Sequence, residues 1–368
     1  MNRLTQLNAN WSSSPGSTIV DVLKEKSISE SDFCSILNIS SSQCKGVISG
    51  YNEITEDIAS KLVQTLGAST EFWLEREAQY RETLNSLSSS EKVKTTWLES
   101  LPTKDMLKFN WIKNTKDSYQ ECLDFFSVPN VETWNLKYKI SNGNPAFRLS
   151  PKFESKNGSI AAWLRQGEII ADQTYCNDWD KDKFLETLEI IKPLTRQKNP
   201  LIFIPKLREL CAECGVAIAI APTPLGCPAS GATKFLSSKK ALLMLSFRYL
   251  RDDNFWFTFF HEAGHLILHG EVRTHIEVTD RKKYSTSDEE IEANNFSAEI
   301  LVPFAHRSEL ENIKSNKKRL ITFAMKMGVS PGIIVGQLQH NGFISPQYLN
   351  GYKRSFKWGE IDEALNIR

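Results

Sequence analysis

The sequence lacks a long apolar run, a signal peptide and an excess of charge. Its longest apolar stretches, such as 216–221, fall far short of the ~18–20 residues that a membrane helix needs, so we expect no membrane partner. Residues 1–16 are polar and have no apolar core of the kind that directs export, which predicts a cytoplasmic location. The 45 Lys and Arg almost balance the 44 Asp and Glu, so net charge does not by itself indicate a nucleic-acid partner.

Cysteine is also scarce. The seven cysteines are odd in number and scattered, which is not the pattern of a disulfide framework, so we expect reduced thiols. The 40% of apolar and 24% of charged residues are near the globular average and exclude a disordered or fibrous protein. The 368 residues leave room for two or three domains.

Residues 1–85 contain five short amphipathic helical patterns separated by turn signals. A Ser or Thr precedes each of the last four patterns as an expected N-cap, and a tight break separates the second helix from the third. This arrangement suits an all-α helix-turn-helix domain. The expected N-caps are Ser29, Ser40, Thr55 and Ser69.

Residues 15–80 closely resemble the antidote-type branch of the lambda-repressor-like helix-turn-helix family. Their most particular feature is an ending that contains Gly67, Ser69, Phe72 and Trp73. The resemblance implies that residues 40–49 form a recognition helix. The candidate DNA contacts on this helix are Ser41, Ser42, Gln43 and Lys45.

Charge leaves a second interpretation open for the same domain. Residues 1–85 hold seven Lys and Arg against eleven Asp and Glu, whereas DNA affinity depends largely on neutralising phosphates. The expected recognition helix offers only Lys45. The domain is therefore predicted either to bind DNA or to dock another protein.

The clearest chemical motif lies in a long helix that we expect from Asp252 or Asp253, as its cap, to Gly270. His261 and His265 are four residues apart, so both imidazoles lie on one helix face and can bind one metal ion. Glu262 can hydrogen-bond the attacking water and act as a general base. This spacing predicts a Zn²⁺-dependent hydrolase.

A catalytic zinc site needs a third protein ligand and one open position. The metzincin pattern would place a histidine six residues after His265, but Glu271 occupies that position. The gluzincin alternative uses a glutamate on a later helix, expected here from Asp288 to Val302. Spacing alone leaves three candidates open on that helix, which are Glu289, Glu290 and Glu292.

The words "DNFWFTFFHEAGHLILHG" and "EIEANNFSAEILVP" together resemble the ImmA/IrrE family of metallo-endopeptidases. The similarity covers roughly residues 160–345. It implies that Glu290, three residues before an Ala-Asn pair, is the third zinc ligand, and that the substrate is a transcriptional repressor. Ser297, Ile300 and Val302 are mild departures from the family pattern that leave the ligands intact.

These patterns predict a mainly α, multidomain chain in which an α+β zincin-like core with a small sheet follows the helix-turn-helix domain. The alternative function is a DNA-binding regulator of a toxin–antitoxin-type operon, with a zinc-binding sensor domain that does not cleave. The oxyanion-stabilising residue stays open among Tyr284, His275 and His269. The expected segments are a helix-turn-helix domain at 1–85, a helical connector at 86–195, a zinc peptidase domain at 196–310 and a helical region at 311–368.

Overall fold

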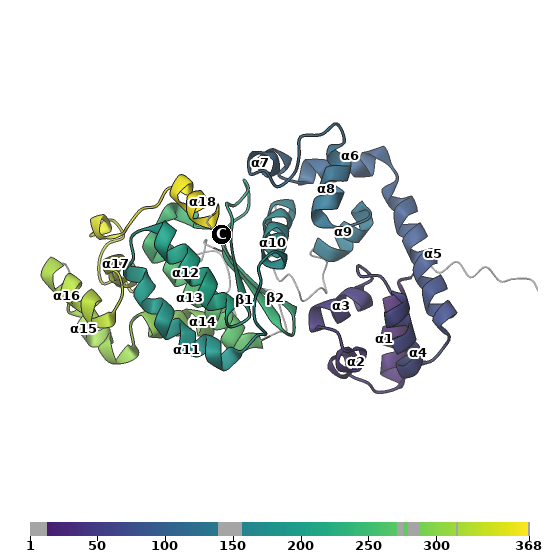
Figure 1. Ribbon diagram of the computed structural model, residues 1–368, viewed down its shortest axis with the longest axis horizontal. Helices are drawn as coiled ribbons and strands as arrows, with labels where there is room; N and C mark the ends of the chain where they lie inside the picture. Colours follow the sequence, from purple (N-terminus) through teal and green to yellow (C-terminus); the bar gives the residue numbers. More distant parts are fainter. Residues whose placement is uncertain (1–12, 139–156, 271–274, 279–287, 314–315, 367–368) are drawn as a thin grey trace, which may run out of the picture. The chain divides into compact units, whose positions relative to one another are not determined.

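The chain divides into two compact units, Met1–Ser141 and Asn142–Arg368, in a computed structural model. The side chains of residues 41, 42, 275–278 and 366 lie outside what the structure describes. The structure describes residues 13–138, 157–270, 275–278, 288–313 and 316–366 (Figure 1).

The secondary structure described in the first unit consists of helices, and the first five surround one small apolar core. Ser29, Ser40, Thr55 and Ser69 each accept a backbone N–H of the helix that follows, so the four expected N-caps are confirmed. The helices are α1 (Pro15–Glu25), α2 (Glu30–Leu37), α3 (Ser41–Ser49), α4 (Glu56–Leu66), α5 (Thr70–Ser88), α6 (Glu91–Ser100), α7 (Thr103–Lys108), α8 (Ser118–Phe126) and α9 (Val131–Tyr138).

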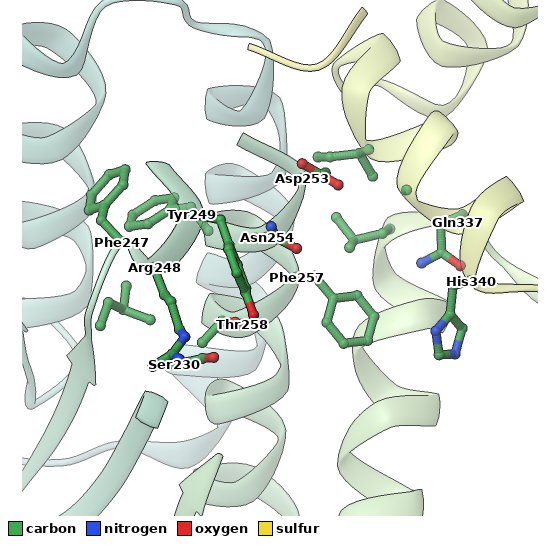
Figure 2. Close-up of a pocket in the computed structure, with 15 residues that line it drawn as sticks. Ser230, Phe247, Arg248, Tyr249, Asp253, Asn254, Phe257, Thr258, Gln337 and His340 are labelled. Atoms are coloured by element: carbon green, nitrogen blue, oxygen red, sulfur yellow. The ribbon is translucent and has the colours of Figure 1, made fainter. Parts of the chain in front are cut away.

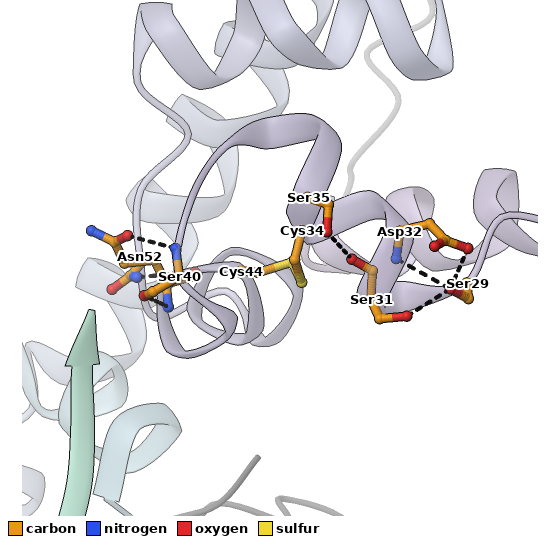
Figure 3. Close-up of a disulfide and its surroundings, with 9 residues drawn as sticks. Ser29, Ser31, Asp32, Cys34, Ser35, Ser40, Cys44 and Asn52 are labelled. Carbon is orange, nitrogen blue, oxygen red and sulfur yellow. Dashed lines mark hydrogen bonds between the residues drawn. A yellow bond between two sulfur atoms is a disulfide. The ribbon is translucent and has the colours of Figure 1, made fainter. Parts of the chain in front are cut away.

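A disulfide joins α2 to α3, between Cys34 and Cys44 (Figure 3). The expectation of reduced thiols is therefore wrong for this pair. The two Cα atoms lie 5.5 Å apart, within the range that a disulfide spans, because the short break at 38–40 brings the two helices together. The separation of ten residues between the two cysteines in the sequence did not predict this disulfide.

The second unit contains a four-stranded sheet and the remaining helices. The strand order is β1-β3-β2-β4, with β1 parallel to β3 and the other two pairs antiparallel. Every residue of β1 is buried, which fits a strand covered on both faces. The strands are β1 (Val216–Ile220), β2 (Ala229–Ser237), β3 (Lys240–Leu245) and β4 (His275–Val278).

Helices cover both faces of this sheet, with α10 on one side and α12 and α13 on the other (Figure 1). One apolar core extends from α11 and α12 through the sheet and α13 to the C-terminal helices. The helices are α10 (Asn157–Asp172), α11 (Lys181–Ile191), α12 (Pro200–Ala212), α13 (Asp252–His269), α14 (Asp288–Leu301), α15 (Arg307–Glu311), α16 (Lys317–Met327), α17 (Pro331–His340) and α18 (Trp358–Asn366).

The segment 86–195, which the sequence presents as one connector, is divided between the units: α6–α9 belong to the first and α10 and α11 to the second. No helix in the described ranges is by itself long and apolar enough to cross a membrane. Helices α16 and α17 meet the length and composition requirements for a membrane span only when they are taken together, across a 108° bend.

The start of α13 differs from expectation. Arg251 occupies the N-cap position without a side-chain cap, and Asp252 is the first helical residue. The buried Asp252 carboxylate accepts hydrogen bonds from Ser330 Oγ at 2.8 Å and from the backbone N–H of Arg354 at 2.9 Å. Asp252 therefore ties α13 to the C-terminal region, a role that local sequence could not indicate.

Candidate metal centre

α13 places the two motif histidines on one buried face. His261 and His265 are buried, and their Nε2 atoms lie 3.1 Å apart. Large aromatic side chains on the same helix, among them Trp256, Phe259 and Phe260, pack into the core and fix its position. The i, i+4 spacing therefore aims both Nε2 atoms at one point, as expected for ligands of a single ion.

α14 brings the carboxylate of Glu290 to the same point. Its Oε2 lies 3.4 Å from His261 Nε2, and its Oε1 lies 3.2 Å from His265 Nε2. Ligand atoms of these three residues all lie within 4.8 Å of one another. Among the described residues, no other group of three or more His, Cys, Asp or Glu is arranged in this way.

Gly264 explains how α14 can approach so closely. A Cβ at Gly264 would lie 3.0 Å from Phe296 Cδ1 and 3.3 Å from the Cα of Ala293. A side chain here would push α14 away from α13, and with it Glu290. The glycine inside the "HEAGH" motif thus permits the helix contact that completes the cluster.

The electrostatics suit a cation. Burial alone would raise the pKa of Glu290, but hydrogen bonds from His261 and His265 outweigh it and hold that pKa well below its usual range. Burial lowers the pKa of His265 and so favours the neutral imidazole, the form that binds metals. Two imidazole nitrogens and a carboxylate with one position left open are a donor set that fits catalytic zinc.

Behind the cluster, His269 and Glu292 orient one of the ligands, His265. His265 Nδ1 lies 3.0 Å from His269 Nδ1, and His269 Nε2 lies 3.0 Å from Glu292 Oε2. Glu292, one of the three candidate ligands, therefore contacts His269. Neither Glu292 nor Glu289 is part of the three-residue cluster.

Glu262 is fully buried beside strand β2. A Cβ built on Gly231 of β2 would lie 2.6 Å from Glu262 Oε1 and 2.6 Å from Thr258 Cγ2. Only a residue without a side chain lets the strand pass this close to the carboxylate. Sequence reasoning missed Gly231, because its neighbour across space is 31 positions away in the chain.

Residues 219–338 match the family model Peptidase_M78, described as an IrrE N-terminal-like domain. The match contains the three clustered residues and Glu262. It supports the ImmA/IrrE resemblance for this part of the chain and points to a metallopeptidase. A comparison with curated proteins gave no match.

Of the three candidate oxyanion-stabilising residues, the structure describes the side chain of one, His269. His269 lies in the M78-like segment and contacts His265 and Glu292 as described above. Tyr284 lies outside the described residues, and so does the side chain of His275 in β4.

The candidate DNA contacts lie on α3 of the first unit, outside the M78-like segment. Gln43 is exposed but caps its own helix: its Oε1 accepts the backbone N–H of Ser40, and its backbone N–H donates to Ser40 Oγ. Lys45 is half-buried. The side chains of Ser41 and Ser42 lie outside the described part of the chain.

Proposed function

We propose that the chain is a cytoplasmic, zinc-dependent endopeptidase that cleaves a protein, and that this protein is a transcriptional repressor. The observation that carries the proposal is the buried carboxylate of Glu262 next in sequence to a His261–His265–Glu290 cluster whose two histidines are buried. Burying several ionisable groups together is costly unless they are paired or coordinate a metal. The match of residues 219–338 to a peptidase family supports the same reaction.

In this proposal His261, His265 and Glu290 hold the zinc ion. Zinc, when bound, supplies a Lewis acid that polarises the scissile carbonyl and makes a water acidic at neutral pH. Glu262 takes a proton from the attacking water and delivers it to the nitrogen of the leaving amine as the C–N bond breaks. His269 holds the ring of His265 in place, with Glu292 on its far side.

The first unit, in this proposal, brings the peptidase to its target by a helix-turn-helix domain that binds DNA or docks a protein. The three-residue break between α2 and α3 and the Ser40–Gln43 capping box support the helix-turn-helix interpretation. The repressor substrate rests on the family resemblance.

The test is a cleavage assay against purified repressors encoded beside the gene. The protein used in the assay has a measured zinc content. Wild type should cut a repressor at a defined site, and Glu262→Gln at equal zinc content should leave it intact. Equal cleavage by both would refute the mechanism. If neither cuts any repressor while both change transcription equally, the chain is a regulator.

A further inference from the structure

A cavity of about 240 Å³ lies beside α13 in the second unit (Figure 2). Its walls come from β2, β3, the segment that follows β3, the first half of α13, α14 and α17. None of the three clustered metal-site residues lines it. The cavity is therefore separate from the metal centre and has its own role to explain.

The cavity lies one helical turn from the metal centre. Phe257 and Thr258, which line it, precede His261 and Glu262 by four residues on α13. The Phe257 and His261 rings are stacked with centroids 6.4 Å apart. The side chains of Thr258 and Glu262 both lie next to the position that a Cβ would occupy at Gly231. The cavity and the metal centre thus lie on one side of α13, about 6 Å apart along the helix axis.

The two charged side chains in the walls both make contacts within the protein. Asp253 Oδ2 forms a buried ion pair with Lys353 Nζ at 2.5 Å. The Arg248 guanidinium donates to the backbone carbonyl of Cys227 at 2.9 Å. A basic occupant would have to compete with Lys353 for Asp253, an acidic occupant would have to compete with the Cys227 carbonyl for Arg248, and either would lose its hydration.

The rest of the wall combines apolar side chains with five polar residues, Ser230, Asn254, Thr258, Gln337 and His340. Leu245, Phe247, Phe255, Leu301 and Ile333 line the cavity and are buried in the main core. At roughly 30 Å³ for each water-sized atom, the cavity holds about eight non-hydrogen atoms, as many as one large side chain contains. Its size and lining suit one side chain rather than a cofactor.

An exposed aromatic residue stands beside this cavity on an unusual backbone. Tyr249 lines the cavity but is exposed, and Phe247, Tyr249 and Leu250 all have positive φ angles, of 49°, 68° and 51°. Such angles cost energy in residues with side chains and are retained where the surroundings demand them. The segment holds Tyr249 where an entering side chain would touch it.

We infer that this cavity is the specificity pocket of the peptidase. It takes a large uncharged side chain, aromatic or branched aliphatic, from the substrate residue beside the scissile bond. The inference rests on the proposed function, because it needs a peptide bond held at the metal centre. It adds the class of residue at which the chain cuts.

Binding tests this without turnover. The probes are hydroxamates, which bind zinc, identical except for a benzyl, isobutyl, methyl, carboxyethyl or aminobutyl side chain. They are titrated calorimetrically into the full zinc-loaded chain. The benzyl and isobutyl compounds should bind at least about tenfold more tightly than the methyl compound, because burying such a side chain fully is worth about one to two orders of magnitude. Both charged compounds should bind more weakly than isobutyl.

Two variants locate the effect. Tyr249→Ala should reduce the benzyl-over-methyl ratio several-fold, whereas Tyr348→Ala, at another exposed tyrosine outside the cavity lining, should leave it unchanged. Gln337→Glu, at a buried cavity residue, adds an unmatched carboxylate of the same size. It should raise the affinity of the aminobutyl compound relative to isobutyl.

The outcomes separate the two proposals. If the chain binds zinc and hydroxamates but ranks all five side chains equally, the pocket is wrong and the metal centre stands. A preference that survives both cavity variants unchanged would likewise overturn the pocket. A chain that holds no zinc in elemental analysis refutes the proposed function, and the pocket's role in it.

Discussion

The two units carry their candidate functional residues in opposite ways. In the second unit His261, Glu262 and His265 are buried among aromatic side chains, and two helices and a strand converge on them. In the first unit, Gln43 is exposed on α3 and serves in a local cap. Exposed polar side chains cost nothing to keep, whereas buried ionisable clusters need a compensating interaction. Burial thus makes the second unit's site the stronger assignment.

The largest effect should come from Glu262→Gln. Glutamine keeps the size of the side chain but cannot accept a proton at neutral pH, so cleavage should fall by about 10²–10⁴-fold. Zinc content should stay at the wild-type level, because the clustered residues are His261, His265 and Glu290. Elemental analysis and a cleavage time course check both parts. Loss of zinc together with cleavage would show that Glu262 holds the metal.

The next effect concerns the third ligand. Glu290→Gln should weaken zinc binding more than the about 10–100-fold that loss of an outer hydrogen-bonding partner costs. Glu292→Gln, which touches only the outer His269 in this network, should remain within that range, and Glu289→Gln should change affinity least. Competition with a zinc-binding dye measures all three. A larger loss for Glu292→Gln than for Glu290→Gln would reverse the assignment.

A third effect should arise at Gly231. The methyl group of Gly231→Ala would lie 2.6 Å from Glu262 Oε1, so the carboxylate must move. A displacement of about 1 Å in a catalytic group can cost about 10²-fold in rate. Cleavage should fall by that order while zinc content is retained. Gly351→Ala, where a Cβ meets nothing within 4 Å, is the matched control. Normal cleavage by Gly231→Ala would separate Glu262 from the reaction.

Much of the local structure could be predicted from sequence, because capping depends on neighbouring residues. The four N-caps of the first unit and the end of α14 before Pro303 followed from local patterns. The failures concern contacts between distant residues. Asp252 or Asp253 was expected to cap α13, but the Asp252 carboxylate binds groups that lie 78 and 102 positions away. The Cys34–Cys44 bond gave no local signal.

The site shows the same division. The His261–His265 spacing follows from helix geometry, but spacing could not choose among three glutamates on α14. The choice depends on how α14 packs at Gly264, a tertiary contact. The cavity beside α13 is assembled from β2 to α17, and no single stretch of sequence reveals it.

Reduction of the disulfide should change the stability of only one of the two units. A bond that closes a short loop typically contributes about 2–4 kcal/mol to the free energy of unfolding. Reducing Cys34–Cys44 should therefore lower the unfolding temperature of the first unit and leave the second unchanged, because its cysteines, Cys176, Cys211, Cys214 and Cys227, are free thiols. Calorimetry with and without reductant measures this. The Cys34→Ser chain should not respond to reductant, and two transitions that shift equally would contradict the assignment.

The smallest effect is expected for DNA binding by the first unit. Lys26 Nζ donates to the carbonyl of Thr65 at 3.1 Å, and Lys61 pairs with Asp57 at 2.7 Å. These contacts compete with phosphate for two of the few cations in residues 1–85, where acidic residues are in excess.

Each neutralised phosphate adds about 0.9 to the slope of log affinity against log salt, so the slope should be shallow. Titration of the full chain into duplex DNA at several salt concentrations measures it. Lys45→Gln should reduce the slope by about one at most. Tight binding at physiological salt would show that charge is a poor guide here. The first unit would then be a functional site in its own right.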